Sequence, residues 1–249
     1  MPDKLRCAVI GAGGIGLDHL HSLVTCHRAA AVALAETNPQ RAREAATRHN
    51  IPRSYADYRE LLDQPDIDAV TIALPTHLHA PVALEALKAR KHVLLEKPMA
   101  MNAREAAKII DTAKQMKRTL MVAQHLRFNK HTQFARSLIE RGDLGEIYHT
   151  RGFWLRRAGI PRIGSWFTQK QYSGGGALAD LGVHVIDAGL HLMREFDVTA
   201  VSCRTHARFG PRGLGEMDWG KSERSIQAML HWLVTPAILR ALAGAGPPT

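Results

Sequence analysis

The stretch Gly11-Ala12-Gly13-Gly14-Ile15-Gly16 stands near the start of the chain, directly after the apolar run at residues 5–10. Its spaced glycines match the G-x-G-x-x-G pattern of a turn that joins a strand to a helix. Glu36 follows 20 residues after Gly16, at the end of a second apolar run. An acidic residue at that distance is the context that a dinucleotide site requires. The stretch therefore predicts a nucleotide-binding βαβ unit, and a Gly-rich turn without a ligand is the plainer alternative.

Three glycines of this stretch have separate expected roles. Gly11 permits a sharp turn, Gly13 lets the backbone approach a pyrophosphate, and Gly16 lets the helix pack closely against the strand. The N–H groups and the positive dipole end of the helix then favour the phosphates. Glu36 is expected to accept hydrogen bonds from the ribose hydroxyls and to repel a 2′-phosphate, which favours NAD over NADP. The nearby Arg41 and Arg43 are expected to soften that preference.

Apolar runs of strand length alternate with helical patterns through the first half of the chain. Strands are expected at residues 5–10, 30–35, 69–74, 92–95 and 120–123, and helices at 15–27, 39–49, 81–89 and 103–116. Asn102 and Glu105 have the spacing of a capping box at the last helix. This alternation predicts an α/β fold, a doubly wound Rossmann sheet of parallel strands over residues 1–124.

The pattern changes near Gln124, and residues 125–249 are expected to form an incomplete α+β domain with an open sheet. Helices are expected at 129–141 and 177–194, a turn at 142–145, a loop at 156–164, and strands at 146–154 and 198–209. Two strands alone make a poor sheet with an exposed edge. No strand alternation is visible after about Ser222.

Composition narrows the classes of protein. The net charge is +10, but basic and acidic residues are interspersed and form no long basic run, so no nucleic-acid partner is expected. A basic surface that attracts an anionic cofactor or sugar phosphate accounts for the charge equally simply. The sequence has no run of about 20 apolar residues, so no membrane span is expected. Cys7, Cys26 and Cys203 are odd in number and widely spaced, which is typical of reduced thiols in a cytoplasmic protein.

Glu96, Lys97 and Pro98 directly follow the expected strand at 92–95. Open α/β sheets bind ligands at the carboxyl ends of their strands, so Lys97 is expected near the nicotinamide end of a cofactor. A lysine there can donate a hydrogen bond to a substrate hydroxyl or carbonyl. A solvated lysine at a strand end is the alternative.

Asp180 and His184 are four residues apart on an expected helix and so share one face. The pKa of histidine suits general acid–base chemistry, and Asp180 is placed to orient the imidazole or the substrate. Asp187 and His191 continue the same stripe, and a merely polar helix face is the alternative. The spacing of Asp180, His184 and His191 matches no metal motif, so no metal is expected.

Two further groups have more than one interpretation. The loop after the strand at 69–74 brings Pro75, Thr76, His77 and His79 toward the ribose, or leaves the two histidines at the surface. Aromatic rings stack on sugars and arginine binds anionic groups, so several later residues are candidates for a sugar pocket, although tryptophan is equally common in a core. These residues are Arg127, Trp154, Arg156, Arg157 and Trp166.

Together these pieces resemble the Gfo/Idh/MocA oxidoreductase family. The matching segments are 11–16, Glu36, 75–79, 96–98, 127–128 and 174–187, in the order that the family has them. The resemblance implies a Rossmann domain followed by an α/β domain whose large open sheet carries substrate and subunit contacts. It also implies NAD(P)-dependent oxidation or reduction of a sugar, cyclitol or related small molecule, with catalytic roles for Lys97, Asp180 and His184.

The resemblance and the residue patterns define two expected sets. The cofactor set is Gly11, Gly13, Gly14, Ile15, Gly16, Glu36, Pro75, Thr76, His79, Glu96 and Lys97. The substrate set is Lys97, Arg127, Trp166, Asp180 and His184. Family members form homo-oligomers and run longer than this chain, and the residues after about Ser222 depart from their pattern. This departure suggests a truncated or frame-shifted product, in which the oligomer is in doubt.

Three functional hypotheses follow. In the first, the protein is a dehydrogenase in which His184 exchanges the hydroxyl proton, Lys97 polarises the oxygen and Asp180 holds the geometry. In the second, it is a non-catalytic dinucleotide-binding protein that regulates a partner. In the third, it is a shortened family member that binds NAD without catalysis.

Overall fold

The computed structural model describes residues 4–155, 165–208 and 212 of the 249. The chain divides into two compact units, one made of residues 1–154 and 166–202 and the other of residues 155–165 and 203–249. The sheet, the helices and the candidate site presented below all belong to the first unit.

Six parallel strands form one sheet in the order β3-β2-β1-β4-β5-β6. The strands are β1 (Leu5–Ile10), β2 (Ala29–Ala35), β3 (Ser54–Tyr55), β4 (Ala69–Ile72), β5 (His92–Leu95) and β6 (Leu120–Val122). The strand order reverses between β1 and β4, which is the point where doubly wound sheets bind their ligands. The predicted α/β Rossmann fold is confirmed.

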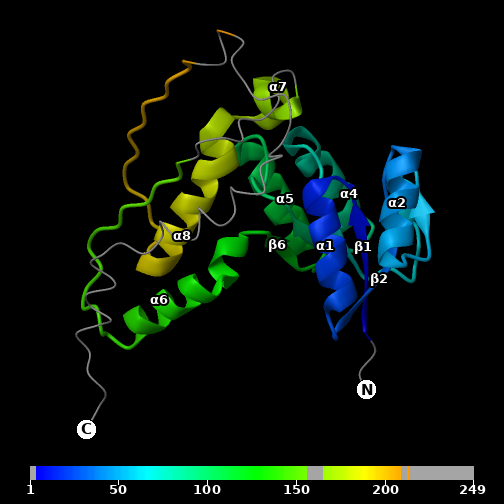
Figure 1. Ribbon diagram of the computed structural model, residues 1–249, viewed down its shortest axis with the longest axis horizontal. Helices are drawn as coiled ribbons and strands as arrows, with labels where there is room; N and C mark the ends of the chain where they lie inside the picture. Colours follow the sequence, from blue (N-terminus) through cyan, green and yellow to red (C-terminus); the bar gives the residue numbers. More distant parts are fainter. Residues whose placement is uncertain (1–3, 156–164, 209–211, 213–249) are drawn as a thin grey trace. The chain divides into compact units, whose positions relative to one another are not determined.

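Helices cover both faces of this sheet (Figure 1). Val9 of β1 packs with buried residues of α1 (Gly14–Thr25) and α2 (Pro39–His49). Its neighbours Ala8 and Ile10 pack on the other face with α3 (Tyr58–Leu62), α4 (His79–Lys88) and α5 (Ala103–Gln115). Adjacent residues of one strand thus enter two different cores, as the two-residue period of a strand requires. This explains why the buried strands read as continuous apolar runs.

A helical region follows the sheet. The 3₁₀ turn η2 (His125–Phe128) leads into α6 (Lys130–Glu140), which packs against α8 (Val183–Met193) (Figure 1). Before α8 come the short helices η3 (Trp166–Thr168) and α7 (Lys170–Ser173), and a π-helical turn at Leu178–Gly182. The turn predicted at 142–145 is present, with positive φ angles of 80° at Gly142 and 64° at Gly145.

The two strands predicted in the second half are wrong. Residues 146–154 and 198–208 are not strands, and the six strands of the Rossmann sheet are the only ones among the described residues. A strand is stabilised by the hydrogen bonds and side chains of a neighbouring strand, and neither segment pairs with one there. Several of their apolar side chains stay in solvent, with Tyr148 88% and Val201 85% exposed. The loop predicted at 156–164, Phe209 and the chain after Ser222 lie outside the described residues.

Candidate active site

The glycine-rich turn forms a cradle that is closed toward the protein and open on its other side. A Cβ atom at Gly11, whose φ is +95°, would lie 2.4 Å from the carbonyl oxygen of Ala73, and a Cβ at Gly16 would lie 1.9 Å from the carbonyl oxygen of Gly11. A Cβ at Gly13 or Gly14 would meet nothing within 4 Å. No side chain caps the first turn of α1, so its N–H groups remain for a phosphate. These residues fit a dinucleotide.

Glu36 ends β2 beside this cradle, and its carboxylate is 8% exposed. One oxygen, Oε2, accepts the N–H of Ala12 at 3.0 Å, while Oε1 accepts the N–H of Asn38 at 2.9 Å and Nη2 of Arg41 at 2.9 Å. Burial works to raise the pKa of Glu36, but the hydrogen bonds from Arg41, Asn38 and Ala12 together lower it. The carboxylate is therefore ionised at neutral pH and fixed against the turn.

Lys97 and Asp180 meet at the carboxyl edge of the sheet although they are 83 residues apart in the chain. Nζ of Lys97 donates to Oδ1 of Asp180 at 3.0 Å and to the backbone carbonyl of Asp180 at 2.8 Å. The two side chains are only 17% and 20% exposed. Asp180 lies within the π-helical turn, and such turns occur frequently at functional sites. The structure thus brings together two of the three predicted catalytic residues directly.

His184, the third predicted catalytic residue, is the second residue of α8 and is 5% exposed. Its Nδ1 atom is buried and has no hydrogen-bond partner among the described residues. Burial, helped by the positive charge of Lys97 and by His125, lowers the pKa of His184 to about 4. The ring of His125 lies 4.7 Å from the His184 ring and that of Trp154 lies 5.7 Å from it. At neutral pH His184 is a neutral imidazole that can accept a proton.

The loops after β4 and β5 are joined by buried hydrogen bonds. His79 is 1% exposed, and its Nδ1 and Nε2 lie 2.7 Å and 2.8 Å from the carbonyl oxygens of Pro98 and Leu74. Glu96 accepts a hydrogen bond from the N–H of Lys97 at 3.0 Å and pairs with His19 of α1 at 2.9 Å. The surface interpretation of His79 is therefore wrong, because the ring fastens one strand-end loop to the next. These contacts fix the backbone on which Lys97 stands.

Two models of known protein families match successive segments of this chain. Residues 5–124 match the model described as the oxidoreductase family with an NAD-binding Rossmann fold, and residues 132–232 match the GFO/IDH/MocA C-terminal domain. The chain belongs to the Gfo/Idh/MocA oxidoreductase family. Its Rossmann domain is the NAD-binding domain of that family.

Similar Gfo/Idh/MocA proteins include named sugar dehydrogenases. The levoglucosan dehydrogenase of Pseudarthrobacter phenanthrenivorans is 40% identical over 66% of this chain and 42% of its own length. The D-glucoside 3-dehydrogenase of Escherichia coli is 33% identical over 91% of this chain and 65% of its own. A solved levoglucosan dehydrogenase in complex with NADH and levoglucosan is 34% identical, with a TM-score of 0.67 over 76% of this chain and 54% of that one. The chain thus spans about half the length of these relatives.

Arg127, Trp166, Pro75 and Thr76, which the sequence also predicts for the site, contact other parts of the protein. Arg127 donates through Nε and Nη2 to both carboxylate oxygens of Asp187, at 2.8 Å and 2.5 Å, and so ties η2 to α8. Trp166 stacks on Phe167 at 3.7 Å between ring centres. Pro75 precedes a short 3₁₀ turn whose first residue, Thr76, is buried. Contacts of these residues with substrate or cofactor stay predictions.

Two rings of the site are not predicted from the sequence. His125 follows the carboxyl end of β6 closely and lies against His184. Tyr172 of α7 lies 4.8 Å from the ring of His77, in the loop after β4. The position of His125 after a parallel strand is a signal that would have found it, because ligands bind at that edge. Tyr172 carries no comparable signal.

Two features are absent from the described part of the chain. It contains no group of three or more His, Cys, Asp or Glu side chains that could hold a metal ion. None of its helices combines the length and the apolar character that crossing a membrane requires.

Proposed function

We propose that the chain is an NAD-dependent dehydrogenase that acts on a CH–OH group of a sugar or related polyol. The observation that carries this proposal is the joint placement of the Lys97–Asp180 ion pair and a neutral, buried His184 at the carboxyl edge of an NAD-binding sheet. The relatives named as levoglucosan and D-glucoside dehydrogenases support the substrate class. The ionised Glu36 favours NAD over NADP, because its charge repels a 2′-phosphate.

The three side chains divide the work of alcohol oxidation. Bound NAD would supply the acceptor for the hydride that leaves the carbinol carbon. His184 accepts the proton of the hydroxyl, since its depressed pKa keeps the imidazole neutral at working pH. Nζ of Lys97 stabilises the negative charge that develops on the oxygen, and Asp180 holds that ammonium in place through its carboxylate and its carbonyl.

The cysteines bear on the compartment of the protein. Cys7, Cys26 and Cys203 are all free thiols, and thiols persist in reducing compartments. A cytoplasmic location is part of the proposal for this reason. The proposal includes a small polyol as the partner and neither a nucleic acid nor a membrane.

The test is NADH formation against a panel of anhydrosugars, glucosides and inositols. His184→Asn removes the proton acceptor and is expected to lower kcat about 100-fold or more, while NADH still binds. His131→Asn, at an exposed histidine of α6, is the matched control and is expected to keep full activity. A His184→Asn enzyme as active as the control would refute the assigned role.

The same panel separates the other two hypotheses. A folded wild-type protein that binds NADH but oxidises and reduces nothing on the panel would favour a non-catalytic dinucleotide-binding protein or an inactive shortened member. Adding the regulatory partner, or extending the chain to the length of its relatives, would then distinguish these two. Turnover of one polyol excludes both.

A further inference from the structure

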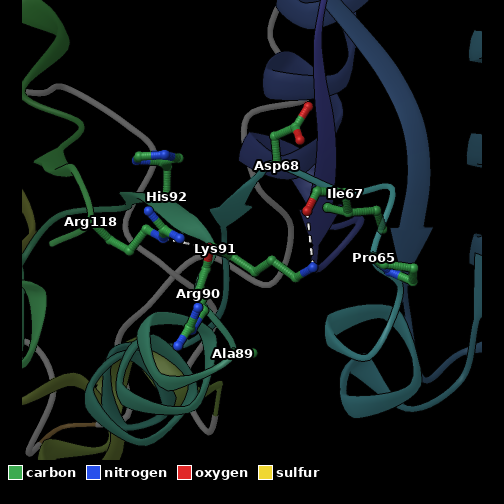
Figure 2. A pocket seen from close by; sticks show the side chains of 8 residues that line it. All are labelled: Pro65, Ile67, Asp68, Ala89, Arg90, Lys91, His92 and Arg118. Carbon is green, nitrogen blue, oxygen red and sulfur yellow. Dashed lines mark hydrogen bonds between the residues drawn. The ribbon is translucent and has the colours of Figure 1, made fainter. Parts of the chain in front are cut away.

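A hollow lies at the opposite edge of the sheet from Lys97. It has a volume of about 360 Å³ and is lined by Pro65, Ile67, Asp68, Ala89, Arg90, Lys91, His92 and Arg118 (Figure 2). We refer to it as the amino-end hollow, because Asp68 and Lys91 directly precede β4 and β5. Strand β5 rises by about 3.3 Å per residue, so roughly 16 Å of backbone separates His92 here from Lys97 at the other end.

The amino-end hollow carries an excess of positive charge. Its carboxylate, Asp68, is bound by Arg6 through Nη2 at 2.7 Å and Nε at 3.0 Å, and these bonds lower the pKa of Asp68 to about 2. Arg6 and Asp68 therefore neutralise each other. The cations Arg90, Lys91 and Arg118 remain around the same space.

Lys91 is the most telling of these cations because its side chain is buried, with the residue 6% exposed. Its Nζ donates to the carbonyl oxygens of Gln64 at 2.6 Å and Ile67 at 2.9 Å. Carbonyl oxygens satisfy the hydrogen bonds of an ammonium group but do not cancel its charge. Asp66, Asp68 and Asp63 act on this charge without hydrogen-bonding to it, so an anion in the adjoining hollow would add to a partial compensation of the burial.

The hollow also has donors held in fixed positions. Nε of Arg118 donates to the carbonyl oxygen of Arg90 at 2.7 Å and Nη1 to that of Lys117 at 3.4 Å, which fixes the guanidinium and leaves its Nη2 to meet a ligand. Nδ1 of His92 accepts the N–H of Thr119 at 3.0 Å, so the neutral ring carries its proton on Nε2 and is a donor there. Figure 2 shows His92, Arg118 and Arg90 gathered along the start of β5, with Lys91 extending the other way toward Ile67.

We propose that the amino-end hollow binds the phosphate group of a small phosphorylated molecule. A phosphate carries up to two negative charges and offers oxygens in several directions, which suits two guanidinium groups and an imidazole N–H that come from two segments, residues 90–92 and Arg118. The volume of about 360 Å³ leaves room for more than the phosphate alone. The site is separate from the NAD cradle and does not depend on the proposed dehydrogenase activity.

The test is a calorimetric titration with inorganic phosphate, at constant ionic strength set by chloride and with NADH saturating. NADH is present because it occupies the glycine-rich cradle, the other phosphate site of the fold. Saturable binding is expected, and Arg90→Ala/Arg118→Ala should weaken it about tenfold or more. Arg104→Ala/Lys108→Ala removes the same charge from exposed positions of α5 and should leave the affinity unchanged.

Further variants and ligands give results that support or refute the phosphate site. Arg118→Lys keeps the charge but loses the planar fork, so an intermediate affinity supports the geometry. Binding of glucose 6-phosphate but not glucose, lost in the Arg90→Ala/Arg118→Ala variant, would identify a phosphorylated metabolite as the ligand. The proposal fails if phosphate shows no saturable binding, or if both double variants, folded by circular dichroism, lose affinity equally.

Discussion

Two glycines of the cradle, Gly16 and Gly13, should respond in opposite ways to the same added methyl group. The Cβ of Gly16→Ala would stand 1.9 Å from the backbone oxygen of Gly11, and neither atom belongs to a flexible side chain. Contacts of this kind do not fall below about 3 Å, so the turn or the start of α1 must move by about 1 Å. Overpacking on this scale costs about 3 kcal/mol, and the better helix propensity of alanine returns up to about 1 kcal/mol. The net loss of about 2 kcal/mol corresponds to a fall in Tm of about 4–8 °C.

Gly13→Ala should leave stability nearly unchanged and weaken the binding of NADH. Gly13 has a φ of −72°, which alanine adopts freely, and its added Cβ would meet nothing within 4 Å. The free energy of unfolding is therefore expected to stay within about 1 kcal/mol of wild type. The methyl group would stand on the open side of the cradle, where a pyrophosphate approaches, so NADH affinity should fall about tenfold or more.

Differential scanning calorimetry measures the first effect, and a fluorescence titration with NADH measures the second. The reasoning requires both results. A Gly16→Ala protein that melts with wild type, or a Gly13→Ala protein that binds NADH as wild type does, would show that the cradle is not closed and open on the sides described.

Three further perturbations have defined outcomes. The pKa of His184 falls from 6.5 to about 4 on folding, so the folded protein binds fewer protons and loses stability as pH falls through that window. Urea unfolding at pH 7 and pH 4.5 should show about 2 kcal/mol more loss in wild type than in His184→Gln, and equal losses would contradict the burial argument. Arg41→Ala removes the cation beside Glu36, so the ratio of kcat/KM for NAD over NADP should rise about tenfold in steady-state assays, whereas an unchanged ratio would leave Arg41 without a role in selectivity. Asp187→Asn breaks the two-bonded pair with Arg127 and should lower stability by about 2 kcal/mol in chemical unfolding; a loss under about 0.5 kcal/mol would mean that η2 and α8 are held by other contacts.

The Rossmann half of the fold is predictable because its signals are local. The start of α5 is an example, since Asn102 accepts the N–H of Glu105 at 3.0 Å, although the Glu105 carboxylate accepts the N–H of Met101 rather than that of Asn102, so half of the expected capping box forms. The two-residue strand β3 and the five-residue helix α3 are too short to show a period, although Asp57 caps α3. The prediction of strands at 146–154 and 198–209 is wrong although both segments carry the sequence pattern of a strand. Alternation is a local signal, but a strand also needs a partner that lies elsewhere.

The site is predictable only as far as strand ends and helix faces identify its residues. Lys97 follows a strand and Asp180 shares a helix face with His184, but nothing local reports that the first two are in direct contact at 3.0 Å. The contact of His125 with His184 likewise depends on how η2 and α8 pack. The depressed pKa of His184 is a property of that packing, because burial is its largest cause.

The group around His184 breaks several rules that the rest of the fold obeys, and this is itself an argument for function. A π-helical turn interrupts the helix at Asp180, a buried Nδ1 of His184 is unpartnered among the described residues, and the Lys97 cation and a second imidazole, His125, both act on His184. Each feature costs stability, and a structural role alone would be served better by apolar side chains. The same features keep an imidazole neutral beside a fixed ammonium, which is the combination that alcohol oxidation requires. If the group were only structural, replacing His184 by leucine would raise the melting temperature at no cost in turnover, whereas the proposed chemistry predicts a stabler protein that no longer oxidises its substrate.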